Sequence, residues 1–151
     1  MLVWLAVAAG LAAGAGCSRQ IGDECTVPAD CNPNGSRACD VSQPGGYCTV
    51  NGCDETTCPE ESTCVRQFPA TFLTEPCDPT QPSTCDSDEL CLDSGVCARR
   101  DTEKRYCAFV CETNGDCREG YECRQTGRKG SMVLSATVGA STAFCAPFIA
   151  D

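Results

Sequence analysis

The chain has 151 residues, of which 17 are Cys and none is His, and its formal net charge is −10. This cysteine density is typical of secreted disulfide scaffolds. The acidic balance argues against nucleic acid as a partner, because binding phosphate backbones relies on Lys and Arg. The lack of His excludes Ser-His-Asp and Cys-His catalysis. We therefore expect a structural or recognition role, no enzyme activity and no cofactor.

Residues 1–16 carry no charged side chain, and their apolar run from Leu2 to Leu11 ends in small residues. This order is typical of a signal peptide. The run is too short for a membrane span, which needs about 20 apolar residues. We therefore expect residues 1–16 to direct export to a compartment in which disulfides form.

Cys17 stands directly after the small residues Ala15 and Gly16. Setting it aside leaves sixteen cysteines, an even number that can pair completely. The position resembles the lipobox of bacterial lipoproteins, in which such a cysteine is diacylated and becomes the N-terminus, although Gly14 stands where that pattern usually has Leu. The resemblance implies a lipid anchor at Cys17, a tether over 17–24 and location in the outer membrane. The alternative is cleavage after Ala15, which releases a soluble secreted protein.

The other sixteen cysteines fall into three groups. The first unit, 25–64, contains Cys25, Cys31, Cys39, Cys48, Cys53, Cys58 and Cys64. The small unit at 77–97 contains Cys77, Cys85, Cys91 and Cys97. The third unit, 98–151, contains Cys107, Cys111, Cys117, Cys123 and Cys145. Because seven and five are odd, we expect a bridge from the first unit to the third, with the central four closing among themselves as an inserted lobe.

Cross-links must supply most of the stability, since only 19 of the 134 residues after Cys17 are Leu, Ile, Val or Phe. Residues 65–76 contain no cysteine and predict an extended linker or an edge strand. The charged residues 99–105 predict a solvated connector. Gly127–Gly130 predicts a turn, and the alternating apolar residues over 132–138 predict a strand in a β-hairpin closed by Cys145.

One sequence pattern occurs near both ends of the chain. Cys25–Cys31 and Cys111–Cys117 share the pattern Cys-x4-Asp-Cys, and each is followed by Gly-Tyr shortly before a cysteine, at Tyr47 and Tyr121. Glycine supplies a turn and the ring can then pack on a disulfide. We interpret these segments as divergent small repeats.

Three elements resemble those of the cysteine-rich outer-membrane lipoproteins of Gram-negative bacteria, a loosely defined surface family. They are Gly22–Cys31, Pro44–Cys48 and Cys111–Cys123. The resemblance implies a small disulfide-rich fold of short β-strands and loops, with little helix outside the signal peptide. It also implies display at the cell surface, where an unidentified protein or glycan is the expected ligand, and it implies no activity.

A metal site finds little support in the sequence. Zinc and iron–sulfur sites favour Cys-x2-Cys pairs or His, and the chain has neither. The only calcium candidate is the acidic loop with Asp86, Asp88 and Glu89, for which a plain solvated loop is the alternative. We therefore expect no metal.

The alternative to a surface lipoprotein is a secreted protease inhibitor or another soluble disulfide-rich binding protein. An inhibitor needs one exposed loop held between two bridges. Arg99-Arg100, between Cys97 and Cys107, is the only candidate for that loop.

Overall fold

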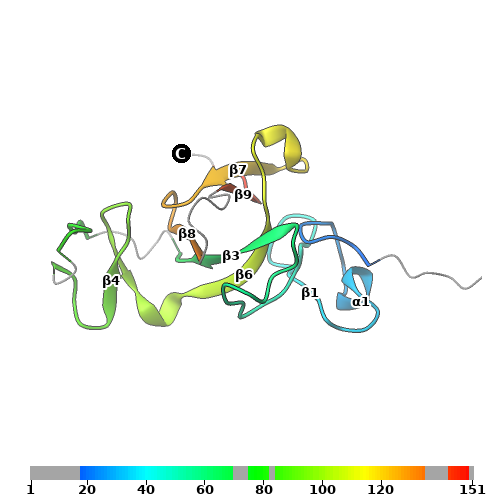
Figure 1. Ribbon diagram of the computed structural model, residues 1–151, viewed down its shortest axis with the longest axis horizontal. Helices are drawn as coiled ribbons and strands as arrows, with labels where there is room; N and C mark the ends of the chain where they lie inside the picture. Colours follow the sequence, from blue (N-terminus) through cyan, green and yellow to red (C-terminus); the bar gives the residue numbers. More distant parts are fainter. Residues whose placement is uncertain (1–17, 70–74, 82–83, 135–142, 150–151) are drawn as a thin grey trace, which may run out of the picture.

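The computed structural model describes residues 18–69, 75–81, 84–134 and 143–149 (Figure 1). The expected signal peptide over 1–16 and the anchor residue Cys17 lie outside these residues. Within the described part, strands of two to six residues alternate with loops, and helical segments have three or four residues. The predicted fold class, small and disulfide-rich with little helix, is confirmed. No helix in the described ranges has the length and apolar character needed to span a membrane.

The strands pair only in antiparallel fashion and form four small sheets, with the orders β1-β2, β6-β3-β8, β4-β5 and β7-β9. The strands are β1 (Ala38–Cys39), β2 (Cys48–Thr49), β3 (Ser62–Gln67), β4 (Glu89–Cys91), β5 (Cys97–Arg99), β6 (Lys104–Phe109), β7 (Tyr121–Gln125), β8 (Ser131–Leu134) and β9 (Ala143–Pro147). The helical segments are α1 (Pro28–Cys31), η3 (Arg100–Thr102) and η4 (Asn114–Asp116).

Eight disulfides use all sixteen cysteines from Cys25 to Cys145. They are Cys25–Cys39, Cys31–Cys48, Cys53–Cys64, Cys58–Cys107, Cys77–Cys91, Cys85–Cys97, Cys111–Cys123 and Cys117–Cys145. They fall into four sets of four cysteines, which we call modules 1 to 4. Module 1 spans 25–48, module 2 spans 53–64 plus Cys107, module 3 spans 77–97 and module 4 spans 111–145. In every module the first cysteine bonds the third and the second bonds the fourth.

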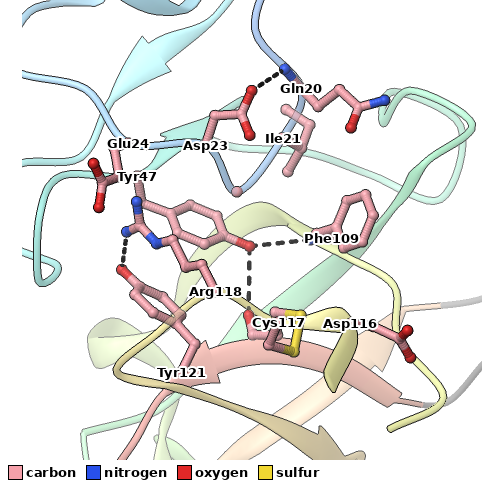
Figure 2. A pocket seen from close by; sticks show the side chains of 12 residues that line it. Gln20, Ile21, Asp23, Glu24, Tyr47, Phe109, Asp116, Cys117, Arg118 and Tyr121 are labelled. Carbon is pink, nitrogen blue, oxygen red and sulfur yellow. Dashed lines mark hydrogen bonds between the residues drawn. A yellow bond between two sulfur atoms is a disulfide. The ribbon is translucent and has the colours of Figure 1, made fainter. Parts of the chain in front are cut away.

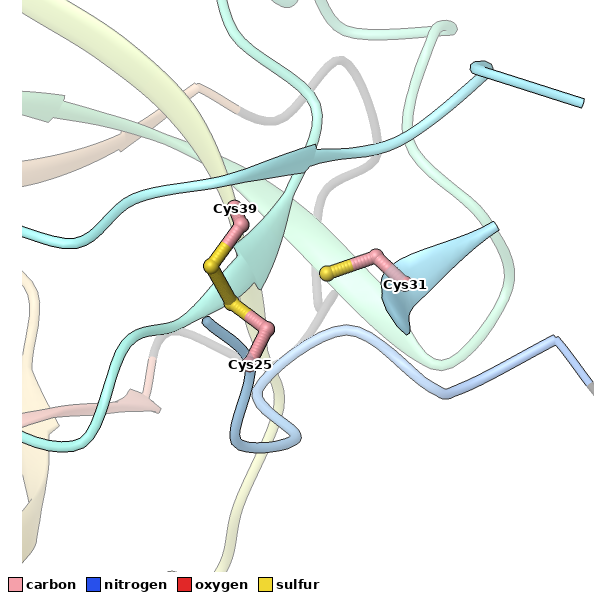
Figure 3. A group of neighbouring side chains, drawn as sticks. All are labelled: Cys25, Cys31 and Cys39. Atoms are coloured by element: carbon pink, nitrogen blue, oxygen red, sulfur yellow. A yellow bond between two sulfur atoms is a disulfide. The ribbon is translucent and has the colours of Figure 1, made fainter. Parts of the chain in front are cut away.

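Strand register explains why the connectivity recurs. In every module the third and fourth cysteines face each other across an antiparallel strand pair, at Cys39↔Cys48, Cys64↔Cys107, Cys91↔Cys97 and Cys123↔Cys145. Directly opposed side chains leave a sheet on the same face. The two bridges of a module therefore lie side by side, and in module 1 the sulfurs of Cys25, Cys31 and Cys39 lie within 4.8 Å of one another (Figure 3). Two bridges thus staple a strand pair that would be marginally stable alone.

The bridge Cys58–Cys107 links the first cysteine group to the third, as the odd group sizes predicted. Cys77, Cys85, Cys91 and Cys97 pair among themselves, also as predicted. Module 3 is therefore nested inside the loop that Cys58–Cys107 closes. It projects as a lobe around β4, at the opposite end of the molecule from α1 (Figure 1).

Two short segments between modules are spanned by no bridge. They are residues 49–52, between modules 1 and 2, and residues 108–110, between modules 2 and 4. Covalently the bridged region consists of three closed bodies: module 1, module 2 with module 3 nested in it, and module 4. The bodies are connected by single strands of backbone.

The core is divided into small clusters rather than gathered in one place. Val65, Ala108 and Phe144 are fully buried where β3, β6 and β9 meet. Phe68 and Leu92 are buried in a separate cluster that attaches the module 3 lobe to the sheet.

The expectation of a linker or edge strand over 65–76 is wrong for its first three residues. Residues 65–67 form the second half of β3, which is the central strand between β6 and β8. Both partner strands lie far along the chain, so the local sequence carries no sign of them. Residues 70–74 of the expected linker lie outside the described residues.

The expected hairpin closed by Cys145 is also wrong in its pairing. The turn over 127–130 is present, with Gly127 N donating to Ser131 O at 2.7 Å. After it, however, β8 pairs with β3, and the strand that contains Cys145, β9, pairs with β7. The remainder of the expected strand, 135–138, lies outside the described residues.

The segment expected to be a free tether is packed against module 1. Arg19 N donates to Cys31 O at 3.1 Å, and Gly22 N donates to Cys48 O at 2.9 Å. Ile21 between them is only 1% exposed. The chain is therefore fixed to the body from Arg19 onward.

Candidate functional site

Two tyrosines join modules 1 and 4. The rings of Tyr47 and Tyr121 stack with centroids 5.5 Å apart and an interplanar angle of 23°. Both rings share a buried cluster with Cys53, Cys64 and Cys107. They therefore pack on disulfides, as the repeated Gly-Tyr pattern led us to expect. The contact between the two rings was not predicted, because a repeat in sequence does not show that its copies touch.

The two hydroxyls reach across the module boundary in opposite directions, and Figure 2 shows that of Tyr47 directed at Phe109. The Tyr47 hydroxyl accepts a hydrogen bond from Phe109 N at 3.0 Å and donates to Cys145 O at 3.4 Å. The Tyr121 hydroxyl donates to Pro44 O at 3.0 Å. Burial raises the pKa of both tyrosines, so the hydroxyls stay protonated and able to donate.

Arg118 completes this contact, which we call the tyrosine clamp (Tyr47, Tyr121 and Arg118). Its guanidinium carbon lies 4.2 Å from the Tyr121 ring centroid and 5.6 Å from that of Tyr47. Its Nη2 donates to Pro44 O at 2.7 Å, to the Tyr121 hydroxyl at 2.5 Å and to Gly46 O. Nε and Nη1 are buried without a hydrogen-bond acceptor, and cation–π attraction to the rings compensates them.

The backbone next to Tyr47 is tightly packed at Gly46. Its φ is +70°, and a Cβ at this position would lie 1.9 Å from the carbonyl oxygen of Cys25. Only glycine fits such a position without displacing the backbone. A hollow of about 310 Å³ opens beside the clamp, but its Arg118 is engaged in holding the modules together. We therefore assign this hollow to the module interface.

The repeated Asp residues form turns. Asp30 Oδ2 accepts hydrogen bonds from Thr26 N at 2.8 Å and Val27 N at 3.1 Å. Asp116 Oδ2 accepts in the same way from Thr113 N at 2.8 Å. These backbone hydrogen bonds hold the pKa of both carboxyls below the usual value. Both carboxylates are thus used in ordering the start of their module.

The structure does not bring the calcium candidates together. Asp88 faces Arg99, with 3.9 Å from Oδ2 to Nη2, whereas Glu89 Oε2 accepts from Asp86 N at 3.4 Å. Within the described ranges, the groups of three possible ligand atoms each contain cysteine sulfurs that are already bonded in disulfides. Those sulfurs are not thiolates and cannot bind a metal as such.

The candidate inhibitory loop is not a free extended segment. The Arg99 guanidinium is bound by Asp101, with Nε to Oδ1 at 3.0 Å and Nη2 to Oδ2 at 2.8 Å, and this hydrogen bonding raises the pKa of Arg99. Arg100 begins the helical turn η3. A protease would have to break this arrangement before it could take Arg99 into a specificity pocket.

A second hollow, of about 280 Å³, gathers residues from module 1, from module 4 and from the chain segments on either side of module 3. We call it the basic groove. It is lined by Asp40, Ser42, Gln43, Gln67, Pro69, Lys104, Tyr106, Arg124, Lys129, Pro147 and Ile149. Three cations and one carboxylate line it, although acidic residues outnumber basic ones 21 to 11 in the whole chain. Glu122 pairs with two of these cations, at 2.7 Å with Arg124 and at 3.8 Å with Lys129, and so offsets part of their charge.

Charges in the groove influence one another. Burial acts to raise the pKa of Asp40, but hydrogen bonds from Ser42 and Gln43 and the nearby Lys104 hold it below its usual value. Burial raises the pKa of Tyr106 to about 12. Arg124 is buried, with its guanidinium bound by Glu122 at 2.7 Å and Pro147 O at 2.6 Å. At neutral pH the groove thus contains cations, the ionised Asp40 carboxylate and a neutral phenol.

The sequence did not predict this groove. Lys104 was assigned to a solvated connector over 99–105, but the connector ends at η3 and Lys104 begins β6. The spacing of Lys104, Tyr106 and Ala108 could have predicted a strand here with Lys104 and Tyr106 on one face, since residues two apart share a face of a strand. The other lining residues come from distant segments that only the fold brings together.

Three comparisons with known proteins found no match. No protein-family model matches it, no curated protein matches it, and no solved structure matches it.

Proposed function

We propose that this protein is an exported lipoprotein, anchored by a lipid on Cys17 in a bacterial outer membrane, that serves as a rigid recognition scaffold. The observation that carries this proposal is the complete pairing of the sixteen cysteines from Cys25 to Cys145. It leaves Cys17 as the one cysteine of the sequence with no partner among the others, at a position that resembles a lipobox. Three acyl chains would make the attachment stable.

Rigidity supports the recognition role. A binding surface held in one conformation loses little entropy when a partner binds. Here each module is closed by two adjacent bridges, and the tyrosine clamp fixes module 1 against module 4. We propose a non-catalytic role, since the sequence has no His for hydrolysis of the Ser-His-Asp or Cys-His type.

Intact mass of the protein recovered from detergent-extracted membranes of its host tests the anchor. We expect a species from Cys17 to Asp151 plus acyl groups, without any cysteine that alkylates under non-reducing conditions. A Cys17→Ser variant is the matched control, and it should lose the acyl mass while it keeps all eight bridges.

A soluble species that begins at Gly16 and carries one alkylated thiol would overturn the anchor. The scaffold would then be a secreted binding protein with a reactive Cys17. Alkylation of more than one cysteine would contradict the pairing itself.

A further inference from the structure

The chain is fixed to module 1 almost at the residue that would carry the lipid. Only Ser18 separates Cys17 from Arg19, whose backbone N–H donates to Cys31 O at 3.1 Å. Ile21, two residues further on, is only 1% exposed. Because consecutive Cα atoms are about 3.8 Å apart, those of Cys17 and Arg19 can be separated by no more than about 7.6 Å. A lipid on Cys17 would therefore be joined to the folded body without a long tether.

A bilayer leaves little room beneath such an attachment. Each headgroup region adds only about 5–8 Å to a hydrocarbon core about 30 Å thick. Acyl chains on Cys17 would lie in the core, so Cys17 itself would lie close to the edge of the core. Arg19 would then lie among the headgroups or directly on them. Cys31, the last residue of α1, would lie at the same level, because Arg19 is hydrogen-bonded to it.

The surface around α1 carries exposed apolar side chains. Val27, directly before α1, is 50% exposed, and Pro28 and Ala29 in its first turn are exposed as well. Four residues separate Val27 from Cys31, which corresponds to about 6 Å of helix rise. Val27 is therefore close to the point where the chain from Cys17 joins module 1. Apolar side chains at such a place can enter the boundary between headgroups and acyl chains.

The two ends of the molecule differ in charge. Residues 18–37 contain two arginines and three carboxylates, whereas module 3 with its flanks, 75–101, contains seven carboxylates and two arginines. The module 3 lobe lies at the opposite end of the molecule from α1 (Figure 1). Anionic phospholipids repel carboxylates that come within a Debye length of about 8–10 Å. Charge thus favours an orientation in which the lobe points away from the membrane.

We propose that module 1 lies on the phospholipid headgroups of the membrane that holds the anchor, with the module 3 lobe directed away from it. The contact surface is formed by Arg19, Val27 and the first turn of α1. This proposal rests on the proposed lipid at Cys17, and it names the lipid surface as the partner of module 1. The lobe is then the end that a partner approaching from outside meets first.

Quenching of tryptophan fluorescence tests the orientation, since residues 18–151 contain no Trp. One variant carries Val27→Trp, and the matched variant carries Ser87→Trp in the exposed turn before β4. The vesicles contain phosphatidylethanolamine and phosphatidylglycerol, with or without phosphatidylcholine that has a nitroxide on its headgroup. The nitroxide should lower the fluorescence of Val27→Trp about twofold or more and that of Ser87→Trp by less than about a tenth, because only the first reporter would lie among headgroups.

The matched pair removes the affinity of Trp for membranes from the comparison, because both variants gain the same side chain. A third variant adds ten Gly and Ser residues between Ser18 and Arg19 to Val27→Trp. Such a linker has an end-to-end distance of about 16–19 Å and would let the body leave the headgroups. Quenching should then fall to about half or less. Intact mass confirms that all variants retain eight bridges.

The test does not depend on natural acylation. Where Cys17 carries no acyl groups, its thiol is alkylated with N-hexadecylmaleimide, and the other sixteen cysteines are protected in bridges. Equal quenching at the two positions, stronger quenching of Ser87→Trp, or quenching unchanged by the linker would overturn the proposal. Oriented binding of the alkylated chain alone would support the contact surface while the natural anchor fails, and acylated protein with equal quenching would give the reverse.

Discussion

Modules 3 and 1 are attached to the rest of the molecule by different means. Module 3 is nested in a loop that the Cys58–Cys107 bridge closes, so it is held covalently at both ends. Module 1 is joined by the unbridged residues 49–52 and is held by the tyrosine clamp and by Ile21, which is buried in one cluster with Cys64 and Cys107. Where no bridge crosses a boundary, buried rings and hydrogen bonds take its place.

The two kinds of attachment should lower the stability in different ways when they are lost. Loss of a bridge acts mainly on the unfolded chain, by restoring its conformational freedom. Loss of a clamp contact acts on the folded state, by leaving a buried donor unpaired. Residues 18–151 contain no Trp, and all three tyrosines lie in or near the clamp, so tyrosine fluorescence of this part of the chain reports on the boundary.

The largest effect is expected from opening the loop around module 3. The double variant Cys58→Ala, Cys107→Ala removes a bridge with a sequence separation of 49 and should lower the free energy of unfolding by about 4 kcal/mol. Urea unfolding under non-reducing conditions, followed by tyrosine fluorescence, measures it. The double variant Cys85→Ala, Cys97→Ala is the control, because it should destabilise the lobe and leave the tyrosine transition nearly unchanged. Equal shifts in both variants would contradict the nested arrangement.

Substitution in the tyrosine clamp should cause a smaller loss of unfolding free energy. Tyr47→Phe leaves Phe109 N buried without an acceptor and should cost about 1–3 kcal/mol in unfolding free energy. Tyr106→Phe removes a hydroxyl from a ring in edge-to-face contact with Tyr47 and should cost less than about 0.5 kcal/mol. Circular dichroism in a urea series serves for both, since either change removes a fluorophore. If both variants cost the same, the hydrogen bond of Tyr47 does not hold the module boundary.

A buried ion pair beside the lobe should matter less again. Glu103 accepts hydrogen bonds from Arg66 at 2.5 Å and from Arg105, and its side chain is 12% exposed. Glu103→Gln should cost about 1–2 kcal/mol, because Arg66 loses its charged partner in a partly buried site. Asp101→Asn breaks the exposed pair with Arg99 and should cost less than about 0.5 kcal/mol. Thermal unfolding of the two variants checks the order.

The smallest effect on stability is expected at low pH, through Asp54. Hydrogen bonds from Thr57 and Thr56 lower the pKa of Asp54 from its ordinary 3.8 to about 2. Because the folded value is the lower one, these bonds stabilise the fold above about pH 4 and are lost as pH falls through about 2. Carboxyl NMR should show the low midpoint, and Thr57→Val should raise it. A native midpoint near 3.8 would rule out the hydrogen-bonded turn.

Cysteine counting predicted more of this fold than any local pattern did. The odd group sizes predicted the link that Cys58–Cys107 forms, and they left the central four to pair alone. The order of bonding within a module could not be predicted, because cysteine spacing does not show which sulfurs the fold brings within bonding distance. Residues 65–67 and β8 were misassigned for the same reason: β3 pairs with segments distant in sequence.

The basic groove could not be predicted from local sequence patterns. Lys104 and Lys129 are 25 positions apart in sequence, and only the pairing of β3 with β6 and the side chain of Gln67 bring them to one place. Ordinary surface cations have the same appearance in sequence. In contrast, Tyr47 and Tyr121 could be singled out, because each follows Gly just before a cysteine.

The two unbridged segments decide what a single proteolytic cut would do. A cut between Cys53 and Cys107, even inside the exposed lobe, leaves both pieces joined through Cys58–Cys107 or a bridge within a module. A cut at 49–52 separates everything after it from the N-terminal end. Thr49 is fully buried, and Gly52 N donates to Arg105 O at 2.8 Å, so this segment is shielded. A single cut in the exposed module 3 lobe would therefore leave the bridged body in one piece.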